Sequence, residues 1–119
     1  MKIRNIEVDF DFLDADDMER FETELQKVKD ECDLKEKKEM SCAEIIREEC
    51  KIIDNFFNNV FGEGIAEKIF KGKKNLNDHV RAFEDIVNEK IKQQKDLNSA
   101  FERYQPNRET RRHNKYNKR

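Results

Sequence analysis

Apolar residues recur every three or four positions along three long stretches of the chain, a spacing that places them on one face of a helix. These stretches cover residues 15–32, 42–61 and 76–104, and a shorter run at residues 65–70 has the same spacing. We therefore expect four helices. The apolar positions of the long stretches are Met18, Phe21, Leu25, Val28 and Cys32; Ile45, Ile46, Ile52, Ile53, Phe56, Phe57, Val60 and Phe61; and Leu76, Val80, Phe83, Val87, Ile91, Leu97 and Phe101.

Polar residues at the boundaries support these helix limits. Asp14 and Asn75 stand immediately before two of the helices, where their side chains can accept hydrogen bonds from the first turn. Ser41 and Glu44 have the spacing of a capping box, in which the two residues bond to each other's backbone N–H groups. Pro106 cannot continue a helix and stops the last one.

The turn Gly62-Glu63-Gly64 separates the second helix from the short third one. Glycine readily adopts the left-handed conformation that ends many helices, so Gly62 and Gly64 are assigned as structural turn residues. The helix before this turn is the most apolar part of the chain and is expected to be central. The stripe of the last helix weakens after Ile91, so the end of that helix is expected to project from the body.

Residues 3–12 alternate between apolar and acidic side chains, which is the pattern of a β-strand. Ile6, Val8, Phe10 and Phe12 share one face, and acidic residues occupy the other. A single strand leaves its backbone groups unpaired and needs a partner. It could pair with a second chain, form a ribbon with another segment, or lie on the helices.

The expected fold is therefore mainly all-α: a small bundle of about four helices with a short N-terminal β-strand. Residues 1–104 form one helical domain, and residues 105–119 form a flexible basic tail. The 119 residues are 44% charged and only 35% hydrophobic, which gives a lean core. Chains of this kind often bury additional area against a partner.

Charge is distributed unevenly along the chain. From Pro106 onward the chain has six Lys and Arg residues and one Glu, a net charge of +5. The rest of the chain has a net charge of −7, and the two parts add to the total of −2. Arg108, Arg111 and Arg112 in this basic tail could contact a protein partner or the phosphates of a nucleic acid, or could simply keep the chain soluble. The acidic remainder of the chain would repel nucleic acid. Nucleic acid is therefore a less favoured partner than protein, although it is not excluded.

Residues able to perform chemistry are few and do not form motifs. His79 and His113 lack a neighbouring nucleophile or metal-ligand pattern, and His79 is expected at the surface or the edge of the core. Cys42 and Cys50 lie too far apart along the chain to share one zinc and are expected to be buried or half-buried thiols. The acidic cluster near residues 9–17 lacks the glycine and terminal glutamate of a calcium loop. The sequence therefore predicts no enzyme, no metal and no cofactor.

The chain is expected in the cytoplasm. It contains no apolar run approaching the ~18 residues that span a bilayer, so no membrane contact is expected. Its N-terminus lacks the apolar core of a signal peptide. Three cysteines without CxxC spacing fit a reducing compartment better than a disulfide framework.

Several segments resemble small proteins of phages and prophages of Gram-positive bacteria. The resemblance touches most of residues 7–112 and is densest over residues 43–78. It is carried by Ala43 to Phe57, Val60 to Gly64, Glu67 to Phe70, Asn75 to Asp78, Tyr104 to Arg108, the pair Arg111-Arg112, and Asp9 to Asp14. The proteins in question resemble tail assembly chaperones of long-tailed phages.

This resemblance implies a protein that coats the hydrophobic tape measure protein in the bacterial host cytoplasm and leaves as tail tube proteins polymerise. Candidate contact points are Phe57, Phe61, Ile65 and Phe70 together with the basic tail. The same four apolar residues could instead fill the core, as apolar stripes usually do. The chain could also form a homo-oligomer. The alternatives are a phage-encoded regulator that binds nucleic acid through the arginines of the tail, and an inhibitor of a host protein.

Overall fold

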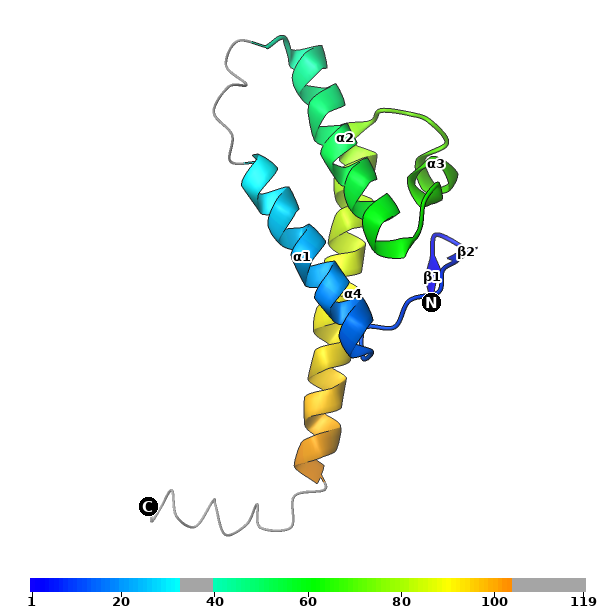
Figure 1. Ribbon diagram of the computed structural model, residues 1–119, viewed down its shortest axis with the longest axis vertical. Helices are drawn as coiled ribbons and strands as arrows, with labels where there is room; N and C mark the ends of the chain where they lie inside the picture. The colour runs from blue at the N-terminus through cyan, green and yellow to red at the C-terminus, as the bar shows by residue number, and fades with distance from the viewer. Residues whose placement is uncertain (33–39, 104–119) are drawn as a thin grey trace, which may run out of the picture. The chain divides into compact units, whose positions relative to one another are not determined.

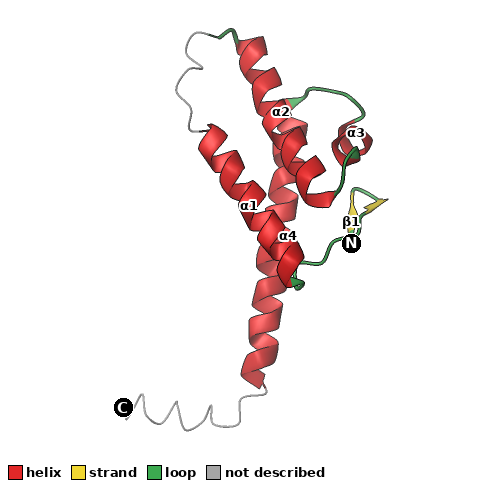
Figure 2. Ribbon diagram, in the orientation of Figure 1, coloured by secondary structure: helices red, strands yellow, loops and turns green. Residues whose placement is uncertain are grey.

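The computed structural model describes residues 1–32 and 40–103, and these form two short strands and four helices (Figure 1). In chain order they are β1 (Lys2–Ile3), β2 (Ile6–Glu7), α1 (Ala15–Cys32), α2 (Cys42–Phe61), α3 (Ile65–Phe70) and α4 (Leu76–Arg103). The mainly helical fold expected from the sequence is confirmed, and Figure 2 shows how little of it is strand. The chain divides into two compact units, Met1–Val87 and Asn88–Arg119.

The helices begin where the polar capping residues predict. The side chains of Asp14 and Asn75 each accept the backbone N–H three residues later, at 3.0 and 2.9 Å. Ser41 accepts the backbone N–H of Glu44 at 3.2 Å, and the Glu44 carboxylate accepts the N–H of Ser41 at 2.8 Å. The capping box is therefore complete, and it satisfies N–H groups that a helix start otherwise leaves unpaired.

The single strand expected over residues 3–12 is wrong in detail. Residues 2–7 form an antiparallel hairpin in which Ile3 pairs with Ile6, and the turn residues Arg4 and Asn5 have φ angles of 50° and 71°. The Val8 backbone still bonds to Met1, donating to its carbonyl oxygen at 2.8 Å. Residues 9–12 then continue outside the hairpin, and the alternating side chains of Val8, Phe10 and Phe12 are buried. The period-two pattern therefore came from a hairpin followed by an extended segment that lies on the helices.

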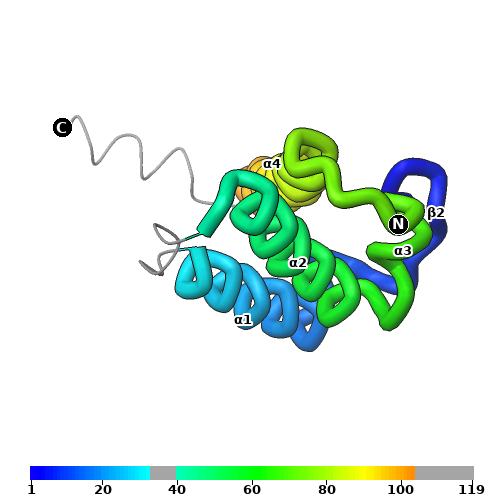
Figure 3. The backbone as a smooth tube through the Cα atoms, turned by 90° about the horizontal axis from the view of Figure 1, so that it is seen from above, coloured from blue at the N-terminus to red at the C-terminus, as the bar shows by residue number. Residues whose placement is uncertain are grey.

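The core of the first unit is a cluster of phenylalanine rings contributed by every helix. Figure 3 shows α2 between α1 and the first turns of α4, which confirms its central position. Phe56 of α2 lies 5.6 Å from Phe21 of α1 and 5.0 Å from Phe83 of α4, measured between ring centroids. Phe10 of the extended segment packs edge-to-face on Phe61 at 4.9 Å. Such edge-to-face pairs add directional attraction to the burial of apolar area.

The glycine turn after α2 uses two different backbone conformations. Gly62 has φ 131° and ψ 145°, whereas Gly64 has φ 88° and ψ −5°, so only Gly64 is left-handed helical. The left-handed residue expected at the end of α2 therefore starts α3 instead. Both φ values lie in the region that favours glycine. The side chain of Asn58 closes the turn by accepting the backbone N–H of Ala66 at 2.9 Å.

The three cysteines differ in exposure. Cys50 is completely buried, whereas Cys32 and Cys42 are exposed, which corrects the expectation of a buried or half-buried Cys42. Cys42 is the first residue of α2, so it lies too near the helix end to be covered. Burial raises the pKa of the Cys50 thiol, and the nearby Asp54 carboxylate raises it further. Both effects reduce the thiolate form that reacts with disulfide reagents.

We expect two of the three thiols in the folded protein to react rapidly with Ellman's reagent. The third, Cys50, reacts only as the protein unfolds, because it is both inaccessible and protonated. The measurement is the time course of thiol release with and without denaturant. A Cys50→Ala variant is the control and should show the two fast thiols alone. Three thiols of equal rate in the folded wild-type protein contradict the described core.

Candidate functional site

The four apolar residues expected to contact a partner lie in the core. Phe57, Phe61, Ile65 and Phe70 are exposed by 0, 7, 7 and 4%. Phe57 packs edge-to-face on Phe70 at 5.7 Å, which joins α2 to α3. A partner could reach these rings only if the first unit opened. Arg108, Arg111 and Arg112 lie outside the described residues.

Large apolar side chains that do face solvent are concentrated on α4. Ile91 and Phe101 are exposed by 55% and 60%. Val87, one turn before Ile91, is the last residue of α4 that packs against the core cluster, and it is also the last residue of the first unit. Ten residues of helix separate Ile91 from Phe101, which places them within about 80° of each other around the axis and about 15 Å apart along it. The second half of α4 thus presents an apolar face.

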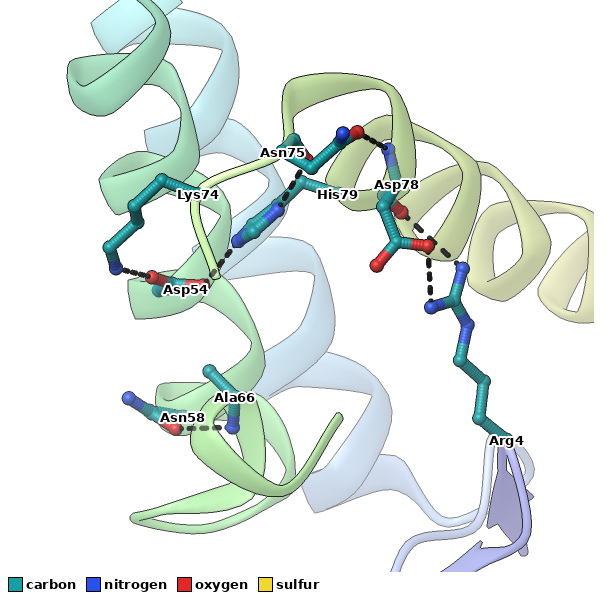
Figure 4. Close-up of polar contacts among 8 residues, drawn as sticks. All are labelled: Arg4, Asp54, Asn58, Ala66, Lys74, Asn75, Asp78 and His79. Atoms are coloured by element: carbon teal, nitrogen blue, oxygen red, sulfur yellow. Dashed lines mark hydrogen bonds and ion pairs between the residues drawn. The ribbon is translucent and has the colours of Figure 1, made fainter. Parts of the chain in front are cut away.

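His79 is completely buried, which corrects the expectation that it lies at the surface or the edge of the core, and both of its ring nitrogens face polar atoms (Figure 4). Its Nδ1 lies 2.8 Å from the backbone carbonyl oxygen of Asn75, and its Nε2 lies 2.9 Å from an oxygen of Asp54. Both neighbours are acceptors, whereas a neutral imidazole carries only one N–H. Both contacts are hydrogen bonds only when each ring nitrogen carries a hydrogen.

Charged and aromatic neighbours surround this histidine. The second oxygen of Asp54 accepts a hydrogen bond from Lys74 at 2.8 Å, and this bond raises the pKa of the Lys74 ammonium group. The ring of Phe70 stacks on the His79 ring at 3.7 Å with an interplanar angle of 10°. The guanidinium of Arg4 also lies over the Phe70 ring, 5.9 Å from its centroid. The cluster thereby joins the hairpin, α2, α3 and α4.

His79 is placed to hold the helices together rather than to transfer protons to a substrate. A general base needs a ring nitrogen within hydrogen-bond reach of the substrate. Both nitrogens of His79 already face protein oxygens, and no part of the ring meets solvent. Buried polar groups with complete hydrogen bonding stabilise a specific packing arrangement. We therefore interpret Asp54 and His79 as a structural pair between α2 and α4.

A second feature that sequence reasoning missed is a pocket of about 190 Å³ between α1 and α2. Its lining residues are Glu24, Lys27, Val28, Glu31, Ile52, Asn55, Phe56 and Asn59. Glu24 accepts hydrogen bonds from Asn59 of α2 and Lys27 of α1, both at 3.1 Å. Glu31 makes no hydrogen bond or ion pair with any residue that the structure describes. Within residues 1–32 and 40–103, the Glu31 carboxylate at the pocket therefore has no bonded partner.

Two observations concern metals and membranes. Within residues 1–32 and 40–103, no three side chains of His, Cys, Asp or Glu converge to hold a metal ion. The described helices include none with the length and apolar character needed to cross a bilayer.

Together, these features define a small helix-rich protein with a phenylalanine core, a buried polar cluster that joins its helices, and an apolar helical face beyond that core. Residues 4–115 match the model of DUF6673, which is described as a family of unknown function. Because the match covers nearly the whole chain, the chain belongs to this family. No curated protein and no solved structure matches it.

Proposed function

We propose that the protein acts by binding a helical segment of another protein, rather than by catalysis, with the second half of α4 as its contact surface. The observation that carries this proposal is the exposure of Ile91 and Phe101 on a helix that continues past the core unit. Single exposed apolar residues are ordinary, but two on one face of an otherwise polar helix favour contact with a partner.

The physical argument concerns the stability of this half-helix. Most of the stability of a helix in a protein comes from packing of its apolar face against other elements rather than from helix propensity. From Asn88 to Arg103, α4 belongs to the second unit, where the half-buried Leu97 accompanies the exposed Ile91 and Phe101. A partner helix laid along this face would bury all three side chains. Leu97 and Phe101 are four residues apart, which is one of the anchor spacings of helix-in-groove contacts.

The resemblance to tail assembly chaperones supports a more specific form of the proposal. In that form the client is a helical segment of a phage tape measure protein, and the tail tube protein later displaces the chaperone in the bacterial host cytoplasm. A chaperone that must leave its client benefits from a small apolar contact repeated along the client, because each contact can be released separately. The face of α4 that carries Ile91 and Phe101 offers such a small apolar contact.

The test is co-expression of the full chain with a soluble-tagged tape measure fragment, followed by gel filtration and an affinity measurement. We expect a complex that the double variant Ile91→Gln, Phe101→Gln weakens at least about 30-fold, the effect of losing a contact worth about 2 kcal/mol. Glutamine preserves helix propensity, so α4 itself should remain. The matched control is Leu13→Gln, which removes a side chain of similar exposure (54%) from the turn two residues before α1.

Two outcomes would contradict this proposal. If the fragment remains insoluble and no complex survives gel filtration, the tape measure protein is not the client. If a complex forms but the double variant binds as well as the Leu13→Gln control, the contact surface is elsewhere.

A further inference from the structure

The second half of α4 carries a stripe of exposed residues with the spacing of a coiled-coil seam. Ile91, Gln94, Asn98 and Phe101 follow one another at intervals of three, four and three residues, and all four are exposed. Alternating intervals of three and four keep one face of a helix turned toward a partner helix along its whole length. The stripe lies wholly within the second unit, so its geometry is that of one continuous helix.

This stripe matches itself when a second copy runs in the opposite direction. In an antiparallel pair centred on the level of Asp96, Ile91 of each copy lies level with Phe101 of the other. Gln94 and Asn98 lie level in the same way, because both pairs are symmetric about that centre. The large apolar side chains then meet at the two ends of the contact, and the amides meet in its middle.

The two central amides give the pair a defined register. Neither Gln94 nor Asn98 makes a hydrogen bond with any residue that the structure describes. Each side chain offers an amide NH₂ and a carbonyl oxygen, so the two can satisfy one another across the contact. A polar residue in the seam of a coiled coil specifies register at a cost in stability. The expected pair is therefore specific but weak.

The charges of this half-helix favour the antiparallel direction. Residues 88–95 contain three lysines and one glutamate, a net charge of +2. Residues 96–103 contain one arginine, one aspartate and one glutamate, a net charge of −1. An antiparallel pair lays each positive half along the negative half of the other copy, whereas a parallel pair lays like charge along like charge. Charges that flank the seam of a coiled coil set the orientation of its helices in this way.

We propose that the second half of α4 pairs in the antiparallel direction with the same segment of a second copy of this chain. This pairing rests on the proposed function in one respect, since both take the face of Ile91 and Phe101 as the contact surface. Sixteen residues of helix, from Asn88 to Arg103, measure about 24 Å. Contacts of so limited an area are weak and transient, so a client helix can replace the second copy.

Sedimentation equilibrium of the full chain alone tests the pairing. We expect monomer and dimer to exchange with a dissociation constant on the order of 100 μM. The double variant Ile91→Gln, Phe101→Gln should raise this constant at least about 10-fold, because it removes the apolar contacts at both ends. Leu13→Gln is the control and should leave the constant unchanged. A chain that stays monomeric up to about 1 mM, or a double variant that dimerises as well as the control, would overturn the proposal.

Cysteine cross-linking tests the direction of the pair. Gln94→Cys and Asn98→Cys are made separately in a chain whose exposed Cys32 and Cys42 are replaced by serine, while Cys50 stays buried. A disulfide requires Cα atoms within about 7 Å of each other. A mixture of the two variants should form the mixed disulfide, because the antiparallel pair places positions 94 and 98 level.

Each variant alone should cross-link much more slowly. In the antiparallel pair, the two copies of position 94 are offset by four residues, or about 6 Å along the axis. Faster cross-linking of each variant with itself than with the other would indicate a parallel pair and overturn the proposal.

Failure of the pairing and failure of the client contact are distinguishable, because sedimentation and cross-linking use the protein alone. A chain that stays monomeric but binds the tape measure fragment through Ile91 and Phe101 overturns the pairing and leaves the proposed function standing. A chain that pairs as described but binds no fragment supports the pairing and contradicts the proposed client.

Discussion

Replacing Phe56 with alanine is expected to lower the free energy of unfolding by about 3–5 kcal/mol. Phe56 is 1% exposed and is the ring that α1, α2 and α4 share. Its centroid lies 5.6 Å from Phe21, 5.6 Å from Phe57 and 5.0 Å from Phe83. Alanine would leave a cavity among rings that the backbone holds apart. The lost stability therefore includes van der Waals contacts as well as the free energy of moving the ring out of water.

Urea unfolding followed by circular dichroism measures this loss, since the chain contains no tryptophan. A small domain has only about 5–15 kcal/mol of stability, so the alanine variant could be largely unfolded. Phe56→Leu, which keeps part of the apolar contact, then supplies a smaller measurable loss. The matched control is Phe101→Ala, which removes the same atoms from a side chain that is 60% exposed. Equal losses at the two positions would contradict the aromatic core.

Replacing His79 with alanine is expected to cost about 3 kcal/mol, the lower end of the range for truncating a large buried ring to alanine. The variant removes the partner of one Asp54 oxygen and of the Asn75 carbonyl, and it uncovers the face of Phe70. The loss stays at the lower end because Lys74 continues to pair with Asp54, whose side chain is 17% exposed.

The control for His79 is Asp78→Asn, one residue earlier on α4. Asp78 pairs with Arg4 at 2.8 Å, but the two side chains are 44% and 34% exposed. Exposed pairs of this kind contribute at most about 1 kcal/mol. If His79→Ala costs no more than Asp78→Asn, the buried cluster does not hold α2 to α4 as described.

The helices were predictable because their signals are local. The caps at Asp14, Ser41 and Asn75 act within three residues, and the apolar stripes need only the helical period. The hairpin was missed because its turn, Arg4-Asn5, lacks the glycine that usually marks such turns. Alternation continues on both sides of it, so the pattern alone could not reveal where the strand reverses.

The candidate sites were less predictable because they depend on contacts between distant residues. Asp54 and His79 lie 25 positions apart, and only packing of α4 on α2 brings them together. A stripe shows which residues share a face, but not what covers that face. For this reason Phe57 and Phe70 could be read as core or as contact surface, and Ile91 and Phe101 were assigned to the apolar stripe of the last helix without being named as contact residues. The pocket between α1 and α2 could likewise not be predicted, because its lining depends on how the two helices align along each other.

The contact between Arg4 and Asp78 spans 74 positions of the chain, and this has a consequence for synthesis on the ribosome. The amino-terminal segment is made first, yet Phe61 and Asp78, which it packs against, are made among the last parts of the core unit. At about 5–20 residues per second, several seconds pass before those partners emerge. During that interval Phe10 has only the nearby rings of Phe12 and Phe21 to pack against, and its contact with Phe61 forms later.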